Sequence, residues 1–415
     1  MSVSEALRHR FVFVYPYEPG AHEARVHGFE HLRSRGFEVE ALVVPVLPGS
    51  PVMQPSMYER DGLRVTVVPD EASLAAFLVE MADTSIFVDF LFGLEAATHR
   101  GRDVLPAIVS AGGAYCVVSG GALPPASDQA SLSQLRRRLA LIANPVRLRD
   151  FVGRKVGALF GTTAASPPPV RVFSGHSEAL EGYLERTGLT RAVVTSVNSF
   201  DYDAYLAYML TRGGEPPAAE PIAVFLDEDA SGHPDFALLG DSSGNMEAGE
   251  YAASLRRLFD AVEQRTGLRV IVAAHPRADY AMRSGFFGDR EVVNGSTVDL
   301  VARSSMVIAH ASTAVSFAAL ADKPLLVVKT AAMLSSSYTL TVDRVAGGLS
   351  IAPICSDEPG VLDGLDWDYK AWSRAGYATY LERYVRSHDA PADKTTWEIV
   401  AETLQDGRYV APSAR

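Results

Sequence analysis

The sequence predicts an α/β protein built from two Rossmann-like, doubly wound domains that face a cleft. The chain has 415 residues, which is more than one hydrophobic core usually serves. Short apolar runs alternate with helix-like stretches along the chain, and this alternation occurs in two consecutive sets. The segment 211–221, rich in glycine and proline, separates the two sets and is the best candidate for a domain boundary.

The first set opens with the apolar run Phe11 to Tyr15, which we expect to be a strand. A helix is predicted over 22–34, because Val26, Phe29 and Leu32 recur near helical spacing. Further strands are expected at 39–46, 64–68, 85–90, 114–121, 170–175 and 191–197. Strands that alternate with helices imply a mainly parallel sheet covered on both faces.

The second set repeats this pattern. Strands are expected to end near Asp229, His275, His310 and Lys329, with helices predicted over 248–266, 297–303 and 314–320. The tail beyond these elements is aromatic and is expected to be largely helical. We therefore expect an N-terminal domain at 1–215, a second domain at 216–365, and a helical tail at 366–415 that packs across the domain junction.

Composition limits the classes of function. The net charge of −12 argues against general nucleic-acid binding, which depends on basic surfaces. No apolar run approaches the length of a bilayer span, and the apolar run at 11–15 is too short for a signal peptide. The two cysteines, Cys116 and Cys355, lie far apart and are expected to be free thiols. We expect a cytoplasmic protein.

The basic segment 131–161 stands out in this acidic chain. It holds seven arginine or lysine residues and one aspartate, a net charge of +6, with apolar residues between them at helical spacing. One interpretation is a helical insertion that is solvated or packs on the acidic body of the protein. The other is reversible docking on an anionic membrane surface, which would make the protein peripheral at the inner face of the membrane.

Polar residues follow three of the strands expected in the second half. These are Asp227-Glu228-Asp229, His275-Pro276-Arg277, and His310-Ala311-Ser312-Thr313, the last directly before a helix. Hydroxyl and backbone N–H groups at a helix start suit a phosphate, and the histidines and Arg277 would bring donors to the same anion. Ordinary capping by Ser312 or Thr313 is the structural alternative.

The first domain is expected to hold a second substrate. The loop from Tyr15 to Gly20 follows the first strand and faces the expected cleft, so Glu18 is a candidate base, although a solvated carboxylate is the commoner case. Asp201 is expected to cap a helix. No metal-ligand constellation is visible, and there is no G-x-G-x-x-G fingerprint after either first strand, which disfavours a dinucleotide enzyme.

The order of an acidic cluster, then HP, then a Ser/Thr pair before a small-residue helix resembles the bacterial sialyltransferases and polysialyltransferases. These are GT-B glycosyltransferases. The stretch STVDLVARSSMVIAHASTAVSFAALADKPLL also resembles capsule and surface-polysaccharide biosynthesis proteins. The resemblance covers about 222–328, and its acidic motif reads DEDASG. It implies that His275, Ser312 and Thr313 bind the nucleotide and its phosphate, and that the donor is a CMP-activated acidic sugar.

We therefore expect an inverting, metal-independent glycosyltransferase with no separate cofactor. A carboxylate, from Asp227, Asp229 or Glu18, would activate the acceptor hydroxyl of a glycan or lipid-linked glycan. His275, Arg277, His310, Ser312 and Thr313 would bind the donor. Two alternatives stay open: a sugar-nucleotide epimerase of the same fold, and a non-catalytic nucleotide-sugar-binding subunit of a polysaccharide assembly complex.

Overall fold

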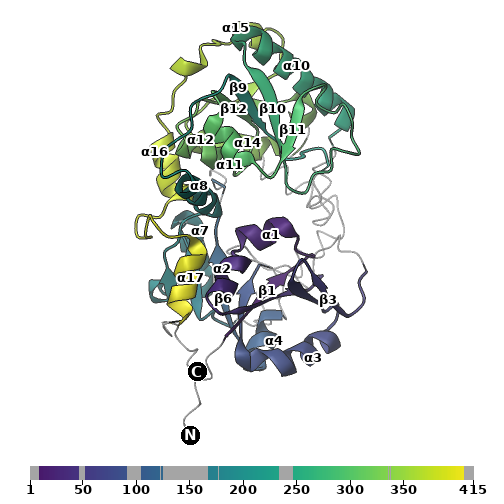
Figure 1. The fold of residues 1–415 in the computed structure, drawn as a ribbon, viewed down its shortest axis with the longest axis vertical. Coiled ribbons are helices and arrows are strands. Elements are labelled where there is room, and N and C mark those ends of the chain that lie inside the picture. Colours follow the sequence, from purple (N-terminus) through teal and green to yellow (C-terminus); the bar gives the residue numbers. More distant parts are fainter. Residues whose placement is uncertain are drawn as a thin grey trace.

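The chain forms two α/β units, each built on its own sheet, in the computed structural model shown in Figure 1. The structure describes residues 9–45, 52–90, 104–121, 123–124, 167–175, 177–232, 246–334, 336 and 338–405. One unit lies above the other in this view, and helix α1 of the first unit faces the second unit. The predicted fold class, with two parallel-sheet domains, is confirmed.

The first unit holds an eight-stranded sheet in the order β3-β4-β2-β1-β5-β6-β7-β8, parallel except for the edge pair β3 and β4. The central strand β1 has five consecutive buried residues, as expected for a strand covered on both faces. The strands are β1 (Arg10–Tyr15), β2 (Glu38–Val43), β3 (Ser56–Arg60), β4 (Leu63–Val67), β5 (Ser85–Asp89), β6 (Ala114–Ser119), β7 (Arg171–Ser174) and β8 (Val194–Thr195).

The second unit holds a six-stranded sheet in the order β11-β10-β9-β12-β13-β14, parallel throughout. The strand order reverses between β9 and β12, and open α/β sheets bind ligands beyond the carboxyl ends of strands at such a point. The strands are β9 (Ile222–Leu226), β10 (Arg269–Ala274), β11 (Glu291–Asn294), β12 (Met306–Ala309), β13 (Leu325–Lys329) and β14 (Ile354–Cys355).

Helices cover both sheets. In the first unit, Phe11, Phe13 and Tyr15 pack into one core, and Val12 and Val14 pack into another, because successive side chains of a strand point to opposite faces. The helices of the first unit are α1 (Ala21–Val26), α2 (Phe29–Ser34), α3 (Glu71–Met81), α4 (Val104–Ser110) and α7 (Ser177–Thr187). Those of the second are α10 (Ala248–Thr266), α11 (Thr297–Arg303), α12 (Val315–Leu320), α13 (Ala331–Leu334), α14 (Tyr338–Gly348) and α15 (Val361–Gly364).

The single helix predicted over 22–34 is wrong, because the chain breaks it into α1 and α2 at Gly28. Gly28 has φ 60°, a left-handed conformation that favours glycine. A Cβ atom at this position would lie 2.4 Å from the Trp397 ring, so the indole packs directly on the bare backbone. Helical periodicity in the sequence could not show this long-range contact.

The structure also contains a strand, β3, that the sequence pattern does not predict. Strand β3 forms a hairpin with β4 through Asp61 and Gly62, which have φ 51° and 71°. An Asp-Gly pair of this kind is typical of a tight hairpin turn. The strand reads SMYER and is largely exposed, so it lacks the apolar run that marks the other strands. At the opposite edge, the strand predicted over 191–197 is only two residues long.

The tail is less helical than predicted. It contains α16 (Tyr377–Tyr380), a π-helical turn over Leu381–Val385, and α17 (Thr396–Gln405), joined by turns and loops. Tyr377, Tyr380 and Tyr384 pack in the core of the second unit, whereas α17 returns to the first unit, where the Trp397 indole donates to the backbone of Val26 (2.9 Å). In Figure 1 the yellow tail runs alongside both units.

Helix α8 (Phe200–Thr211) lies within the residues predicted for the first domain, but Tyr202 packs in the core of the second unit. Its N-cap is Ser199, whose hydroxyl accepts a hydrogen bond from the Tyr202 N–H (3.1 Å). The prediction that Asp201 caps this helix is therefore wrong. Burial raises the pKa of Asp201 to about 7.

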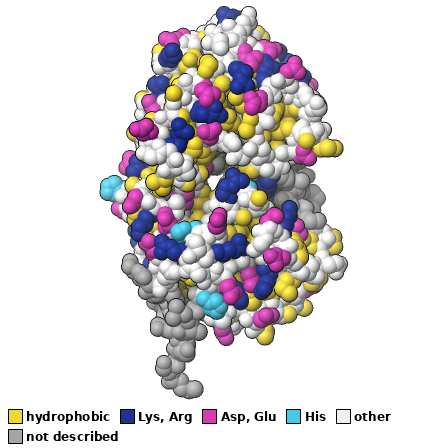
Figure 2. Space-filling model, viewed as in Figure 1, with side chains coloured by type: hydrophobic (Ala, Val, Ile, Leu, Met, Phe, Trp, Pro, Cys, Tyr) yellow, Lys and Arg dark blue, Asp and Glu magenta, His cyan; other side chains and the backbone are white. Residues whose placement is uncertain are grey.

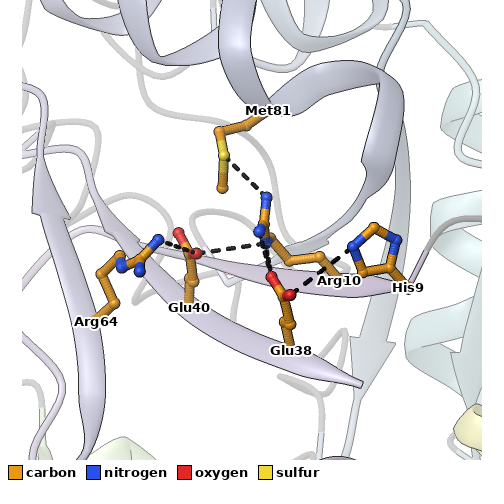
Figure 3. A network of polar contacts seen from close by, with 6 residues as sticks. All are labelled: His9, Arg10, Glu38, Glu40, Arg64 and Met81. Carbon is orange, nitrogen blue, oxygen red and sulfur yellow. Dashed lines mark hydrogen bonds and ion pairs between the residues drawn. The ribbon is translucent and has the colours of Figure 1, made fainter. Parts of the chain in front are cut away.

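Ion pairs hold the first sheet at the end opposite its carboxyl edge (Figure 3). Arg10, at the start of β1, pairs with Glu38 and with the buried Glu40 (3.3 Å), and Arg64 of β4 also reaches Glu40 (3.0 Å). Burial raises the pKa of Glu40, although both arginines lower it. This network stabilises strand pairing far from the candidate site.

The basic segment 131–161 lies outside the described residues. Within the part of the chain that the structure describes, no helix is both long enough and apolar enough to cross a membrane.

Candidate functional site

Asp227 lies directly after β9 and ties two loops to the end of this strand. Its Oδ1 atom accepts from the Asp229 N–H (3.0 Å), and its Oδ2 atom accepts from the His275 N–H (3.2 Å) and the Tyr280 hydroxyl (2.8 Å). The side chain is buried, and this burial raises the pKa of Asp227 to about 6, while the hydrogen bonds act in the opposite direction. Asp227 thus fixes the exit of β10 relative to that of β9.

Asp229 is bound on both carboxylate oxygens. The two terminal nitrogens of Arg283 donate to its two oxygens at 2.6 and 2.8 Å, a bidentate arrangement that gives strong, directional pairing. The same guanidinium lies over the Tyr280 ring, 4.4 Å from its centroid. Asp229 has φ 48°, which aspartate tolerates better than most residues. The carboxylate therefore anchors the loop after β10.

Glu228 extends to the exit of β12. Its Oε1 atom accepts from the Ala311 N–H (2.7 Å), and the Ser312 N–H also donates to this carboxyl group. Burial raises the pKa of Glu228 to about 8. The acidic motif thus joins the exits of β9, β10 and β12, and Glu228 accepts from backbone donors that the sequence suggested for a phosphate.

His310 lies in the core of the second unit, with no exposed surface. Its Nδ1 atom lies 2.7 Å from the Val328 carbonyl and its Nε2 atom 2.9 Å from the Tyr251 hydroxyl. The carbonyl can only accept, so Nδ1 carries the proton and Nε2 accepts from Tyr251. Burial lowers the pKa of His310 to about 4. The histidine therefore links β12 to β13 and to α10 within the core of the second unit.

The other predicted donor-binding residues lie at the exits of β10 and β12. His275 is half-buried, and its Nδ1 atom accepts from the Arg277 N–H (3.3 Å). The Ser312 hydroxyl accepts from the Ala314 N–H (3.2 Å), and Thr313 is exposed. These residues stand at the carboxyl ends of β10 and β12, the two strands that flank β9 in the second sheet.

A cavity of about 330 Å³ lies between the two units. The surface is hollowed between the units in Figure 2, with basic side chains on its borders. The first unit lines the cavity with the loop after β1, with α1 and with Arg60 of β3; the second lines it with the exits of β10 and β11. The lining residues are Glu18, Gly20, Ala21, His22, Glu23, Arg25, Arg60, Pro276, Arg277, Asn294 and Gly295.

The side chain of Arg277, in the second unit, contacts residues of the first unit. Its guanidinium carbon lies 4.9 Å from the centroid of the Tyr17 ring, and its Nε atom lies 3.8 Å from Oε1 of Glu23. Glu23 is buried, and its other oxygen accepts from the Gly20 N–H at the start of α1 (2.8 Å). Arg277 therefore faces the cavity between an aromatic ring and a carboxylate of the opposite unit.

His22 contributes an imidazole to the lining of this cavity. Burial lowers its pKa, the Glu23 carboxylate acts against this, and the positive charges of Arg25 and Arg277 lower the pKa further. A neutral imidazole near pH 7 can accept a proton. Glu18, the base suggested by the sequence, is exposed and lies 3.7 Å from Arg60. The sequence placed His22 at the start of a helix but offered no sign of its charge state.

A second cavity, of about 420 Å³, lies beside the first on the second unit. Its walls carry the rings of Tyr280 and Phe286 and the guanidinium groups of Arg283 and Arg290. Asn294, at the end of β11, lines both cavities. Among the described residues, no group of three or more His, Cys, Asp or Glu side chains is arranged to hold a metal ion.

Neither a protein-family model nor a curated protein matches this chain. Several solved structures resemble it in fold at low sequence identity. A variant of the wall teichoic acid polymerase TagF is 10% identical, with a TM-score of 0.49 over 96% of this chain and 89% of that one. A putative UDP-N-acetylglucosamine 2-epimerase from Listeria monocytogenes is 12% identical, with a TM-score of 0.49 over 98% and 99%. Acinetobacter baumannii MurG is 11% identical, with a TM-score of 0.44 over 96% and 99%.

Proposed function

We propose that the protein is a glycosyltransferase that moves a sugar from a nucleotide-sugar to a glycan or lipid-linked acceptor in surface-polysaccharide biosynthesis. The observation that carries this proposal is the cavity lined by both units, to which the second unit contributes Arg277 and the first contributes His22. A cavity lined by both units can bring the reacting groups of two substrates together, which is what group transfer requires.

The donor nucleotide is assigned to the second unit. His275 stands at the exit of β10, and Ser312 and Thr313 stand at the exit of β12, on either side of β9. Arg277 adds positive charge to the lining of the cavity. The resemblance to sialyltransferases favours a CMP-activated acidic sugar. His310 would act indirectly, by holding β12 against β13 through the Val328 carbonyl.

For the base that activates the acceptor hydroxyl, the geometry favours His22 over the carboxylates suggested by the sequence. Asp229 is bound on both oxygens by Arg283, and Asp227 accepts three hydrogen bonds from the protein. Glu18 is exposed beside Arg60. His22 instead lines the cavity with a lowered pKa, so its imidazole is available to take a proton at neutral pH.

The proposed reaction is a single inverting displacement. The acceptor oxygen forms a bond to the anomeric carbon while the bond from that carbon to the phosphate oxygen breaks. The hydroxyl proton passes to His22, and the charge that develops on the leaving phosphate is met by Arg277. Because a guanidinium group can neutralise this charge, we propose that the reaction proceeds without a metal ion.

The proposed location of the protein is the cytoplasm, where nucleotide-sugars are made. Docking of the basic segment 131–161 on an anionic membrane would bring the cavity near a lipid-linked acceptor. An epimerase of the same fold would release free nucleotide and an altered sugar with no acceptor present, so this outcome distinguishes the two activities.

The test is titration of the protein with CMP, UDP, GDP and CDP by calorimetry, followed by incubation with the corresponding nucleotide-sugars and glycan acceptors. We expect tightest binding of CMP and acceptor-dependent release of CMP. His275→Ala is expected to weaken nucleotide binding while the protein stays folded. Failure of all four nucleotides to bind the wild-type protein would overturn the proposed function.

A further inference from the structure

The cavity between the units is rich in guanidinium groups. Arg25, Arg60 and Arg277 line it, together with two carboxylates, Glu18 and Glu23. His22 is held towards its neutral form by burial and by the neighbouring arginines, so it adds no compensating charge. The lining is thus net positive in a chain whose net charge is −12. A positive cavity in an acidic protein favours an anionic ligand.

The ion pairs within this cavity are loose. Arg277 lies 3.8 Å from Glu23 and Arg60 lies 3.7 Å from Glu18, both beyond hydrogen-bond distance. Elsewhere in the second unit, Arg283 and Arg290 bind their carboxylates at 2.6 Å. An incoming anion could therefore bind Arg60 without displacing a hydrogen-bonded carboxylate.

Two of the three arginines belong to the first unit. His22 and Arg25 are three residues apart on α1, so their side chains lie on the same face of this helix. Arg60, at the end of β3, lines the cavity with them. A sugar whose hydroxyl meets His22 would therefore place its other substituents within reach of guanidinium groups that belong to the unit assigned to the acceptor.

We propose that the acceptor is an anionic sugar, whose carboxylate or phosphate group is bound by Arg25 and Arg60 while its reacting hydroxyl faces His22. This inference rests on the proposed function, because it assigns the first-unit side of the cavity to the acceptor. Charge-assisted contacts to a carboxylate or phosphate are stronger than those to a neutral hydroxyl, so such a site would select acceptors by charge.

The test uses three probes that share one ring and differ at carbon 6: D-glucose, D-glucuronate and D-glucose 6-phosphate. Their binding is measured by ligand-observed NMR with wild-type protein and with the variants Arg25→Ala, Arg60→Ala and Arg35→Ala. Arg35 is the matched control, because it is a partly exposed arginine of the first unit that pairs loosely with Glu402 (3.8 Å) outside the cavity. Binding of CMP is measured on each variant in parallel.

We expect glucuronate or glucose 6-phosphate to bind at least about tenfold more tightly than glucose, and the better of the two identifies the anion as carboxylate or phosphate. Arg25→Ala and Arg60→Ala are expected to remove this preference, and Arg35→Ala is expected to preserve it. All three variants are expected to bind CMP like the wild type.

Equal binding of the three sugars, or a preference that survives both cavity variants, overturns the inference while the proposed function stands. Loss of CMP binding in the cavity variants also overturns it, because the arginines would then belong to the donor site. Wild-type protein that binds no nucleotide overturns the proposed function and, with it, the assignment to an acceptor.

Discussion

The guanidinium carbon of Arg277, on the loop after β10, lies 4.9 Å from the centroid of the Tyr17 ring, on the loop after β1. This contact joins the carboxyl edges of the two sheets across the cavity. A cation–π contact of this kind contributes about 0.5–1 kcal/mol at an exposed site, too little to hold two domains together by itself. Its geometry is better suited to presenting the charge of Arg277 to a ligand than to locking the units.

Replacement of Arg277 should therefore affect turnover more than stability. Loss of a hydrogen bond to a charged group costs about 1.5–3 kcal/mol, so we expect Arg277→Ala to lower kcat/KM by about 10- to 100-fold. The kcat/KM of Arg277→Lys should lie between those of the wild type and Arg277→Ala, because lysine keeps the charge but not the planar donor set. Steady-state kinetics with the donor that binds best provides the measurement.

Arg212→Ala is the matched control, since Arg212 also lies over a tyrosine, 5.8 Å from the centroid of the Tyr208 ring, but directly after α8 and not among the residues that line the cavity. Its kinetics should equal those of the wild type. If Arg277→Ala turns over donor as fast as Arg212→Ala, the leaving phosphate does not meet Arg277.

His22→Gln tests the proposed base. A positioned general base contributes about 10²- to 10⁴-fold, so we expect kcat to fall within this range while the nucleotide still binds. Burial and Arg25 and Arg277 lower the pKa of His22, so the wild-type enzyme should stay active down to a pH below 6.5 and then lose activity as the imidazole becomes protonated. The variant should lack this acidic limb of the pH profile.

His31→Gln serves as the control, because burial also lowers the pKa of His31, which lies on α2. It should change neither kcat nor the pH profile. An acidic limb that persists unchanged in His22→Gln would assign the base to another group, and Glu18 would be the next candidate.

EDTA is expected to leave turnover unchanged, because Arg277 is proposed to meet the charge of the leaving phosphate. The measurement is the rate with and without the chelator, followed by addition of Mg²⁺ or Mn²⁺. A loss that either ion restores would contradict metal independence and would bring Asp227, Asp229, Asp201 and Asp203 forward as ligands.

Asp229→Asn should destabilise the second unit, because it removes the charge that Arg283 binds on both oxygens. Asparagine tolerates φ 48°, so the backbone stays unstrained and only the pairing changes. We expect a loss of about 1.5–3 kcal/mol in the free energy of unfolding, measured by urea denaturation. Asp289→Asn, at an exposed carboxylate of the same loop, should cost far less. Equal stability of the two variants would show that the pair does not anchor the loop.

The fold followed from the sequence wherever local pattern and tertiary structure agree. The helices over 248–266 and 297–303 and the buried strands appear where apolar periodicity placed them. Sequence reasoning failed at Gly28, where Trp397 packs from far along the chain, and at β3, whose residues are largely exposed. In these places a long-range contact or strand pairing, rather than local periodicity, decides the structure.

The candidate site was predictable at the level of strand exits but not of individual roles. The sequence placed His275 and Arg277 at the carboxyl edge of the second sheet, because both follow a buried strand. That Glu228 would reach the Ala311 amide, or that His310 would be fully buried, depends on side-chain direction at adjacent exits. The sequence places these residues near one another without fixing which of them face the cavity.

Buried carboxyl groups, Glu228 above all, should make the stability of the protein depend on pH. Burial raises the pKa of Glu228 to about 8 and those of Asp201 and Asp203 to about 7, above the usual values for carboxyl groups. Between the ordinary and the raised pKa, the folded protein binds protons that the unfolded chain has released, so stability falls as pH rises through this window. Buried His310, with its pKa lowered to about 4, acts in the opposite sense, but only below its ordinary value near 6.5.

Between pH 6.5 and 8, the loss of stability caused by the buried carboxyl groups should therefore be measurable without a contribution from His310. We expect the melting temperature of the wild-type protein to fall across this range, since each proton difference changes the free energy of unfolding by about 1.4 kcal/mol per pH unit. Glu228→Gln keeps an oxygen that can accept from the Ala311 and Ser312 amides and removes the titrating proton. Its melting temperature should fall less steeply and should exceed that of the wild type at pH 8. Asp299→Asn, at a half-buried carboxylate on α11 that pairs with Arg303, is the control and should keep the wild-type slope. A wild-type slope in Glu228→Gln would mean that Glu228 is already ionised at neutral pH and binds the two amides as a carboxylate.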